Sequence, residues 1–340
     1  MAVIPVSVIK SDFSRLLVAL GYPLLYRGKV GELYEVPGKP SQLLMVRSDR
    51  LSIFDFVLRC LVRRKGEVLI AITHYWLTQV FRSVPNHLLA WGMDEERWTA
   101  AGWDMADVEK LPLERTLLVE RREIWPYEMI YRAHIGGSVW NEYLKSGTAG
   151  GNALPQGLSK WQRLTEPIFT PTTKAETGHD VPMTVDEYAF AAGEPGRLIA
   201  MRDHVIYNVA YHHARQRGLL VLDTKFENSP DGKLVDEVLT PDSSRFTTPD
   251  DLEIAVSEGR DPTFYDKEPV RVWGRGVETP WGTGINNLDP ADREHLEFVA
   301  GLEVPMGVVE EATNRYLDIV SRLTTLPLEY YRRDGMSIPL

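Results

Sequence analysis

The sequence predicts a globular fold that mixes strands and helices in two domains. A chain of 340 residues can bury one large core or two moderate ones. Its hydrophobic fraction of 44% and charged fraction of 25% are those of an ordinary soluble protein. Short β-type runs and segments of helical spacing occur in both halves, and a polar break at 120–123 separates them. We therefore expect domains at 1–122 and 123–340.

Charge and cysteine content exclude several classes of protein. A formal net charge of -10 argues against general nucleic-acid binding, which needs a basic face to displace counterions. Cys60 is the only cysteine, so no intrachain disulfide or cysteine-cluster metal site is possible, and a small buried thiol is expected. No signal pattern opens the chain and no apolar run is long enough to cross a bilayer. We expect a cytoplasmic protein without nucleic-acid or membrane partners.

A glycine-rich segment stands near the start of the chain. Residues 24–36 predict two short strands around Gly28-Lys29 and Gly31. Glycines let backbone approach a ligand, and the Lys29 ammonium suits a phosphate. A plain tight turn with a solvated lysine explains the same residues, because this is not the P-loop pattern.

Further elements follow from apolar spacing and turn residues. The segment 88–110 holds three tryptophans and is expected to be an insertion or a cover over a cleft. The segment 48–55 suggests a structured loop or a salt-bridged turn. Strands are predicted at 43–46 and 116–120. An amphipathic helix is predicted at 68–84, with Trp76 and Phe81 in the core, and further helices at 197–217, 247–258 and 308–323. An extended segment at 166–180 is closed by a capping box at Thr184–Glu187, and 259–290 is expected to form an arm or lid.

The second half begins with a candidate anion site. Residues 128–132 predict a strand that leads through Gly136-Gly137-Ser138 into a helix at 139–145. Backbone N–H groups at the helix start, with Ser138 and Arg132, can bind an anion. A glycine-rich turn with Ser138 as N-cap explains the sequence equally well.

Residues 219–245 place charged side chains inside two apolar, β-branched runs. The runs flank a turn rich in Asn, Ser, Pro, Asp and Gly, which predicts a β-hairpin. Side chains alternate along a strand, so Asp223, Lys225 and Glu227 are expected on one face. Charges are costly in a sheet unless they are paired or metal-bound. This face is therefore a candidate site.

The turn of this hairpin has two solutions. A two-residue turn at Asp231-Gly232 places Glu227 directly opposite Asp236. Two converging carboxylates destabilise a sheet but suit Mg2+ and leave places for nucleotide phosphates. A type I turn that begins at Pro230, with a bulge at Gly232, shifts the register by one and separates the carboxylates.

Eight segments in sequence order carry a family resemblance. They are Gly28-Lys29-Val30 with Leu33-Tyr34; Ser48-Asp49-Arg50-Leu51-Ser52 with Phe54-Asp55; Lys65 to Leu69; Glu128 through Arg132 to Ser138; Glu142-Tyr143 with Ser146-Gly147-Thr148; Glu166 through Lys174 to Glu176; Asp223 to Glu227; and Asp236 to Arg245. Together they resemble the SAICAR synthetase family (phosphoribosylaminoimidazole-succinocarboxamide synthase) of purine biosynthesis.

The resemblance implies a fold and an activity. The fold is α+β, with an ATP-grasp-like nucleotide cleft between an antiparallel N-terminal sheet and a larger C-terminal domain. The activity is amide formation in which ATP phosphorylates the carboxylate of a phosphoribosyl aminoimidazole and the amine of aspartate displaces the phosphate. ATP and Mg2+ are the implied cofactors. A phosphoribosyl azole carboxylate and an amino acid are the implied partners.

The resemblance also implies roles for individual residues. These are nucleotide binding for Gly28, Lys29, Glu120, Glu227 and Asp236, with Glu227 and Asp236 as metal ligands; catalysis for Lys225, Lys174 and Asp223; and substrate binding for Arg132, Ser138, Asp180, Asp242 and Arg245.

Some positions depart from the family pattern. Where the family commonly has Gly-Lys-Val-Arg-Asp, this chain has Gly31 and Glu32 after Gly28-Lys29-Val30, and Asn228-Ser229 replaces Phe-Gly after Glu227. The position before Glu128 and the arm around 260–280 also differ. A paralogue acting on another azole nucleotide or amine, and a nucleotide sensor without activity, are therefore alternatives.

Overall fold

The chain forms two compact units. The computed structural model describes residues 12–174 and 180–340. Trp76–His87 and Arg122–Phe264 belong to the first unit, and the described residues up to Tyr75, with Leu88–Arg121 and Tyr265–Leu340, belong to the second. One division lies at Arg121/Arg122, beside the expected boundary. Residues 265–340, which we expected in the domain 123–340, group with the N-terminal sheet.

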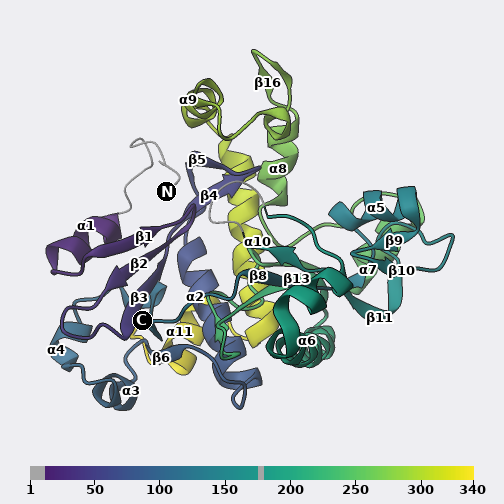
Figure 1. The fold of residues 1–340 in the computed structure, drawn as a ribbon. Coiled ribbons are helices and arrows are strands. Elements are labelled where there is room, and N and C mark those ends of the chain that lie inside the picture. Colours follow the sequence, from purple (N-terminus) through teal and green to yellow (C-terminus); the bar gives the residue numbers. More distant parts are fainter. Residues whose placement is uncertain (1–11, 175–179) are drawn as a thin grey trace. The chain divides into compact units, whose positions relative to one another are not determined.

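The second unit contains a five-stranded antiparallel sheet in the order β1-β2-β3-β7-β6 (Figure 1). Three strands confirm the predictions at 24–36 and 43–46, and β7 has the predicted bounds. Half of the segment 48–55, expected as a structured loop or a salt-bridged turn, is strand, because it forms a separate hairpin with the chain that follows. The turn of this hairpin contains Asp55, which pairs with Lys29. The strands are β1 (Leu24–Arg27), β2 (Gly31–Glu35), β3 (Gln42–Arg47), β4 (Arg50–Ile53), β5 (Phe56–Leu61), β6 (Leu88–Trp91) and β7 (Thr116–Glu120).

Helix α2 (Lys65–Tyr75) lies at the centre of the second unit. Every residue of α2 is buried, so the expectation of an amphipathic helix at 68–84 is wrong. Helices packed against it explain this burial, because α10 (Met306–Thr324) and α11 (Leu328–Met336) cover the side that would otherwise face water. The predicted core residues Trp76 and Phe81 follow α2, in and just after η1 (Trp76–Val80), and are buried.

The tryptophans of the 88–110 segment are buried within the second unit. Trp91, Trp98 and Trp103 are each at most 7% exposed, and the last two pack edge to face at 5.0 Å. The segment is therefore a piece of core with its own secondary structure, not an open cover. The remaining elements of this unit are α1 (Asp12–Ala19), α3 (Glu95–Ala100), α4 (Met105–Val108), η2 (Leu113–Arg115), α8 (Glu268–Arg275), β16 (Glu278–Thr279), β17 (Gly282–Thr283), η3 (Ile285–Asn287) and α9 (Arg293–Gly301).

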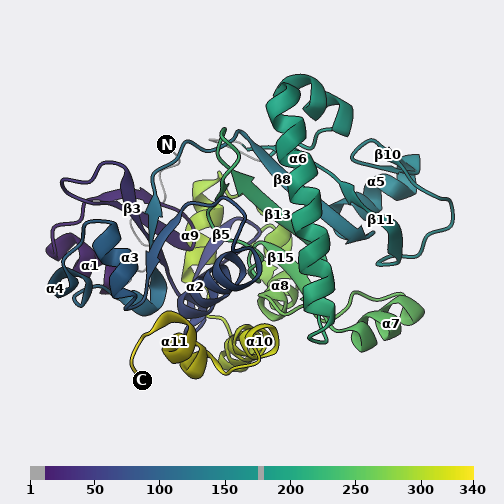
Figure 2. The same ribbon diagram turned by 90° about the horizontal axis from the view of Figure 1, so that it is seen from below.

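The first unit is built on an antiparallel sheet with the path β11-β8-β13-β14. Strand β12 also pairs with β8, and β15 pairs with β13. The long helix α6 (Val185–Arg215) runs across β8 and β13 and covers one face (Figure 2). The strands are β8 (Tyr127–His134), β9 (Thr148–Ala149), β10 (Asn152–Ala153), β11 (Arg163–Phe169), β12 (Thr172–Thr173), β13 (Leu220–Asn228), β14 (Leu234–Val235) and β15 (Ser244–Thr247).

Helix boundaries in the first unit follow local sequence signals. The capping box between Thr184 and Glu187 starts α6, which begins earlier than the predicted 197 because a kink at Gly193 joins two helical parts. Helix α7 (Pro249–Glu258) starts at the predicted proline. Helix α5 (Ser138–Ser146) follows the glycine pair, but its N-cap is Gly137, so the predicted N-cap at Ser138 is wrong.

The hairpin turn adopts the second of its two predicted solutions. The N–H of Gly232 donates to the carbonyl of Ser229 at 2.8 Å, and Gly232 has a φ of 82°. Glu227 therefore pairs with Val235, and the first solution, with Glu227 opposite Asp236, is wrong. The type I turn places Pro230 and Asp231 at its two central positions and leaves glycine for the left-handed position.

Two further observations concern the chain as a whole. Within the described ranges, no helix combines the length and the apolarity that crossing a membrane requires. Cys60 lies on β5 and is half-buried, and burial raises the pKa of its thiol to about 11.

Candidate active site

One face of the first-unit sheet carries charges and the other faces α6. On β13, Phe226 and Thr224 are almost completely buried, and the Tyr131 hydroxyl on neighbouring β8 donates to the Ala200 carbonyl of α6 at 2.6 Å. Asp223, Lys225 and Glu227 alternate with these positions, as the sequence predicts. Because α6 takes the apolar face, the charged residues gather on the other one.

A row of three charged residues crosses this face. Asp223 pairs with Arg132 of β8 on one side and with Arg245 of β15 on the other. Its Oδ2 accepts from Arg132 Nη1 at 2.6 Å and from Arg245 Nη1 at 2.5 Å. Arg132 Nε also donates to Thr170 Oγ1 at 2.9 Å. The Arg132 side chain is 7% exposed and that of Arg245 is 30% exposed, so Arg245 presents the accessible guanidinium.

The start of α5 lies beside the Arg245 guanidinium. A Cβ at Gly137 would lie 2.9 Å from Arg245 Nη1, and the φ of Gly137 is 63°. A side chain here would be strained by the positive φ and would displace the Arg245 guanidinium. Ser138, the first residue of α5, is exposed. Arg245 thus lies beside Gly137, the N-cap residue of α5, and Asp223 joins it to Arg132. An anion site formed by the helix start, Ser138 and Arg132 stays a prediction.

The carboxylates farther along β13 are paired with lysines. Lys225 Nζ donates to Glu128 Oε1 at 2.7 Å, and Lys174 forms an ion pair with Glu227. Burial opposes the charge of Lys225, but Glu128 and Glu227 outweigh it and raise its pKa. Lys225 therefore stays cationic in this environment.

Asp236 follows β14 directly, and the strand register does not place it opposite Glu227. Its φ of 59° breaks the extended backbone directly after β14, so its side chain no longer follows the strand alternation. Burial, and then the charge of Asp236, raise the pKa of Glu227. The charge of Asp236 thus acts on Glu227, although the two residues are not paired across the strands.

The Glu227 and Asp236 carboxylates have the chemistry of ligands for a divalent cation, although Glu227 is ion-paired with Lys174 in this structure. A second carboxylate nearby raises the pKa of a buried carboxylate, because the two negative charges repel each other. A bound metal ion would stabilise both charges. Mg2+ favours one or two protein carboxylates together with water and phosphate oxygens. Among residues 12–174 and 180–340, no cluster of three or more His, Cys, Asp or Glu side chains suits a metal ion.

Two predicted substrate residues lie outside this charged row. Asp242 is part of the turn that precedes β15, where its N–H donates to Thr240 Oγ1 at 3.3 Å. Asp180 is exposed and adjoins residues that the structure does not describe. Glu176, part of a motif that carries the resemblance, lies outside the described residues.

The predicted nucleotide loop lies in the second unit. The N–H of Gly28 donates to the carbonyl of Gly31 at 2.8 Å, which closes the turn between β1 and β2. Lys29 is half-exposed and pairs with Asp55 at 2.7 Å. Glu120 pairs with Gln42, whereas Gly31 pairs with Arg47 at the other end of β3. The sheet therefore separates Glu120 from the glycine loop by roughly 15 Å along the strands.

A protein-family model identifies the family of this chain. The model described as SAICAR synthetase matches residues 24–288. The chain belongs to the SAICAR synthetase family. The resemblance stated from the eight motifs is confirmed, and with it the mixed α+β class. The ATP-grasp-like cleft stays a prediction.

Curated SAICAR synthetase relatives are similar along nearly the whole chain. Phosphoribosylaminoimidazole-succinocarboxamide synthase of Syntrophobacter fumaroxidans is 37% identical over 331 residues, which cover 96% of this chain and 98% of the relative. The protein of the same name from Thioalkalivibrio sulfidiphilus is 37% identical over 309 residues, with 89% and 95% covered. That of Saccharomyces cerevisiae is 34% identical over 311 residues, with 89% and 94% covered.

Solved structures agree with this assignment. The SAICAR synthase of Saccharomyces cerevisiae in complex with SAICAR has a TM-score of 0.71 and 30% identity, and the match covers 94% of this chain and 98% of the yeast chain. SAICAR synthetases are ATP-dependent ligases that form an amide bond, and this chain is a ligase of that kind.

Three residues that the predicted site omitted belong to its immediate surroundings in this SAICAR synthetase. Glu128 pairs with Lys225, Thr170 accepts from Arg132, and Asp55 pairs with Lys29. Side chains alternate along β8, so the position of Glu128 four residues before Arg132 could have indicated that both lie on the same face. Asp55 lies in a motif already recognised. Thr170 also lies in a recognised motif, but its contact with Arg132 was not foreseeable, because that partner lies 38 residues earlier in the chain.

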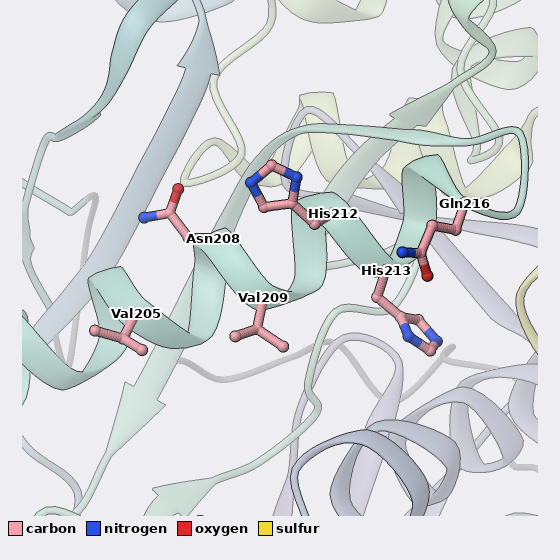
Figure 3. Close-up of a pocket in the computed structure, with 6 residues that line it drawn as sticks. All are labelled: Val205, Asn208, Val209, His212, His213 and Gln216. Atoms are coloured by element: carbon pink, nitrogen blue, oxygen red, sulfur yellow. The ribbon is translucent and has the colours of Figure 1, made fainter.

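A separate hollow lies on the outer face of α6 (Figure 3). Val205 and Val209 point away from the sheet here, while His213 turns toward Trp76 and packs against its ring at 5.3 Å. Burial lowers the pKa of His213 to about 4, which favours a neutral packing role. The hollow contains none of the predicted site residues; its lining consists of Val205, Asn208, Val209, His212, His213 and Gln216.

Proposed function

We propose that this enzyme joins the carboxylate of a phosphoribosyl aminoimidazole (CAIR) to the amine of L-aspartate. ATP is consumed and SAICAR, ADP and phosphate are formed, in de novo purine biosynthesis. The relatives in bacteria and yeast carry the name of this activity. A structure of similar fold, with 17% identity and a TM-score of 0.56, is a SAICAR synthetase in complex with ADP, and the yeast structure contains SAICAR.

The observation that carries the proposal is the row Arg132–Asp223–Arg245 beside the start of α5. Two guanidinium groups share one carboxylate, so the three side chains together retain a positive charge. Arg245 is the more accessible of the two and adjoins Gly137, the N-cap residue of α5. Guanidinium and helix N-terminus are both phosphate-binding groups. This row would bind the ribose phosphate of the azole substrate.

Lysines on the same face suit the transfer of the phosphoryl group. A carboxylate oxygen of CAIR attacks the γ-phosphorus of ATP, the bond from γ-phosphorus to the bridging oxygen breaks, and ADP leaves. Lys174 and Lys225 provide positive charge for this step, and Lys225 keeps its proton because its pKa is raised by Glu128 and Glu227. Such catalysis rests on positioning and charge stabilisation more than on covalent participation by the protein.

Amide formation completes the reaction. The aspartate amine attacks the acyl carbon, a C–N bond forms, the C–O bond to phosphate breaks, and the nitrogen loses a proton. Asp223 holds the two arginines during both steps and so keeps the azole in place. The carbonyl oxygen of the substrate ends in the amide, and one original carboxylate oxygen leaves with the phosphate.

Mg2+ would be held by Glu227 and Asp236. When bound, the ion would neutralise the phosphate charges of ATP. The glycine loop with Lys29 would bind the polyphosphate, and Glu120 another part of the nucleotide. Asp180 and Asp242 remain proposed substrate contacts. A cytoplasmic location and the lack of nucleic-acid partners stay predictions from the single cysteine and the net charge.

An isotope experiment tests the proposed chemistry. CAIR labelled with 18O in its carboxylate is incubated with the enzyme, ATP, Mg2+ and aspartate, and the inorganic phosphate is analysed by mass spectrometry. We expect one 18O atom per phosphate and one ADP per SAICAR. ADP release without CAIR, or unlabelled phosphate, would contradict an acyl phosphate pathway.

The two alternatives predict different results. A paralogue for another azole nucleotide or amine would be inactive with CAIR and aspartate but active with other pairs; the names of the relatives do not favour it. A sensor without activity would bind ATP without turnover. Under our proposal Asp236→Asn lowers kcat, and unchanged turnover in that variant would remove the metal role of Asp236.

A further inference from the structure

The indole ring of Trp161 lies against the accessible arginine of the charged row. The Arg245 guanidinium lies over this ring, with 5.8 Å between its Cζ and the ring centroid. A cation over the face of a tryptophan is attracted by the partial negative charge of that face. Trp161 is 2% exposed, whereas the Arg245 side chain is 30% exposed. The ring is therefore a buried support beneath a guanidinium that solvent can reach.

The two glycines before α5 make room for this pair. A Cβ at Gly136 would lie 2.2 Å from two ring atoms of Trp161, and a Cβ at Gly137 would lie 2.9 Å from Arg245 Nη1. The indole therefore packs directly on the backbone of Gly136, and the guanidinium lies beside that of Gly137. The ring, the guanidinium and the chain that leads into α5 thus form one packed group.

Several contacts fix the orientation of the indole. Its Nε1–H donates to Asp261 Oδ1 at 2.7 Å, and the Phe264 ring packs against it edge to face at 5.3 Å. The backbone is held as well, since the Trp161 N–H donates to the Ile135 carbonyl at 2.6 Å and the Trp161 carbonyl oxygen lies 2.9 Å from His134 Nδ1. Ring and backbone are both anchored, so the face of the ring has a defined direction.

Trp161 also occupies a backbone conformation that side chains seldom adopt. Its φ is 65°, and it is the third residue of a turn in which the Gln162 N–H donates to the Ser159 carbonyl at 3.0 Å. A positive φ at this position of a turn favours glycine. Such strain persists only where the surroundings require it, and it gathers at functional sites. A large ring at a position suited to glycine indicates that the ring itself is used.

The ring and Asp223 restrain Arg245 in different ways. Asp223 Oδ2 accepts from Arg132 and from Arg245 Nη1, so this bond fixes one corner of the Arg245 guanidinium. Contact with the face of Trp161 restricts the rotation that such a bond leaves open. An arginine side chain that is already ordered loses less conformational entropy when it binds a ligand.

We infer that Trp161 is a positioning residue for the substrate phosphate, and that its ring holds the Arg245 guanidinium beside the start of α5. Trp161 acts through Arg245 and makes no contact of its own with the substrate. This inference rests on the proposed function of Arg245, because it assumes that this guanidinium binds the ribose phosphate of CAIR.

A double substitution tests whether the ring acts through Arg245. Trp161→Leu removes the ring face and should raise the KM for CAIR by about fivefold, the effect of one cation–π contact. The KM for ATP and that for aspartate should change by less than about twofold, because a general loss of packing would affect all substrates alike. Arg245→Met should raise the KM for CAIR by about tenfold or more. In the double variant, Trp161→Leu should add less than about twofold to that increase, because the ring then has no guanidinium to hold.

Two further variants serve as matched controls. Trp161→Phe keeps an aromatic face, so its KM for CAIR should lie between those of the wild type and Trp161→Leu. Trp91 carries the Arg97 guanidinium over its ring at 4.3 Å, in the second unit, so Trp91→Leu removes the same kind of contact outside the proposed phosphate site. Its KM for CAIR should stay within about twofold of the wild-type value. A rise in Trp91→Leu equal to that in Trp161→Leu would overturn the inference.

The outcomes separate this inference from the proposed function. If Arg245→Met leaves the KM for CAIR unchanged, the proposed phosphate role of Arg245 fails. If Arg245→Met raises it but Trp161→Leu does not, only the role of Trp161 is overturned. The same holds if the two effects multiply in full in the double variant, because the ring would then act independently of Arg245.

Asp261 provides a second test, which does not depend on the folding of Trp161→Leu. Its side chain is 53% exposed, so substitutions there should leave the chain folded. Asp261→Ala removes the acceptor of the indole N–H and Asp261→Asn keeps an acceptor oxygen, while both lose the ion pair with Lys160. We expect the KM for CAIR to be about threefold higher in Asp261→Ala than in Asp261→Asn. If circular dichroism shows Trp161→Leu to be unfolded, this pair decides, and equal KM values for CAIR overturn the inference.

Discussion

The charged face of the first-unit sheet and the glycine loop of the second unit hold their functional groups in opposite ways. On the sheet, Arg132 and Asp223 are buried and bonded to each other, and Lys225 is bonded to Glu128. In the loop, Lys29 has a side chain that is 49% exposed and one ion pair. Side chains on the sheet are thus fixed by their buried partners, whereas the exposed Lys29 side chain has room to reorient.

This difference separates the effects expected on stability from those on binding. Removing a charge from the buried row leaves its partners desolvated, which costs folding energy as well as binding. Removing a half-exposed charge costs mainly binding, because water and salt already screen its ion pair. The following substitutions test this contrast, starting with the largest effect.

Asp223→Asn should cause the largest change. It leaves the guanidinium groups of Arg132 and Arg245 facing each other without the shared carboxylate. We expect the free energy of unfolding to fall by about 3 kcal/mol and the KM for CAIR to rise. Urea denaturation and steady-state kinetics measure the two. Asp231→Asn, which breaks the exposed pair with Arg122, is the matched control and should lower the free energy of unfolding by less than about 1 kcal/mol. Equal losses in the two variants would contradict the contrast.

Glu227→Gln should raise the requirement for metal. It removes one of two interacting carboxylates, so the Mg2+ concentration for half-maximal velocity should increase by about tenfold. The pKa of Glu227 is raised by burial and by Asp236, so the wild-type Mg2+ requirement should also increase as pH falls and this carboxyl protonates. The variant should lose that part of the pH dependence. A wild-type enzyme fully active after removal of Mg2+ by EDTA would refute the metal site.

Each unit also contains a buried histidine that makes it sensitive to acid. Burial lowers the pKa of His134 to about 4 and that of His74 to about 3. Both are neutral when folded but bind a proton in the unfolded chain below about pH 6.5. Stability is therefore complete above that pH and is lost as pH falls toward the folded values, by about 2 kcal/mol per histidine at pH 5.

Single substitutions show how much of the stability lost in acid comes from the histidine of each unit. His134→Gln keeps a group that can bond to the Trp161 carbonyl, and His74→Gln one that can bond to the Tyr331 hydroxyl. We expect each variant to lose less free energy of unfolding between pH 7 and pH 5 than the wild type. Denaturation curves at the two pH values provide the comparison, and an unchanged pH dependence in both variants would exclude the histidines as its source.

Lys29→Met should have the smallest effect on stability. The ion pair with Asp55 is exposed, so the free energy of unfolding should change by less than about 1 kcal/mol. The KM for ATP should nevertheless rise by about tenfold. Thermal unfolding and kinetics on the same preparation measure both quantities. A loss of stability comparable with that of Asp223→Asn would show that the loop is held as rigidly as the sheet.

The local sequence predicted an element correctly where its apolar pattern alone determines the structure. The apolar run at 116–120 between polar residues gave a strand with the observed bounds, and alternation placed Asp223, Lys225 and Glu227 on one face. Helix α2 was predicted with one polar side because its period allows that, but distant helices bury it all round. Burial by helices from distant parts of the chain cannot be predicted from the local sequence.

The details of the site depended on backbone geometry that sequence leaves open. Pro230 and Gly232 are compatible with both turns, and only the observed bond from Gly232 to Ser229 distinguishes them. The left-handed conformation of Asp236 is unusual for a residue with a side chain, so alternation alone placed it incorrectly. The contact between Arg245 and Trp161 joins two distant segments of the chain, and neither segment reveals it by itself.

The single thiol has a practical consequence for spectroscopy. With its pKa near 11 and its half-buried position on β5, Cys60 remains protonated at neutral pH and should react slowly with maleimide dyes. A second cysteine introduced at an exposed turn, such as Asp231, would therefore accept a fluorophore selectively without removal of the natural thiol. Nucleotide titrations of such labelled enzyme could follow motions of the hairpin by fluorescence anisotropy.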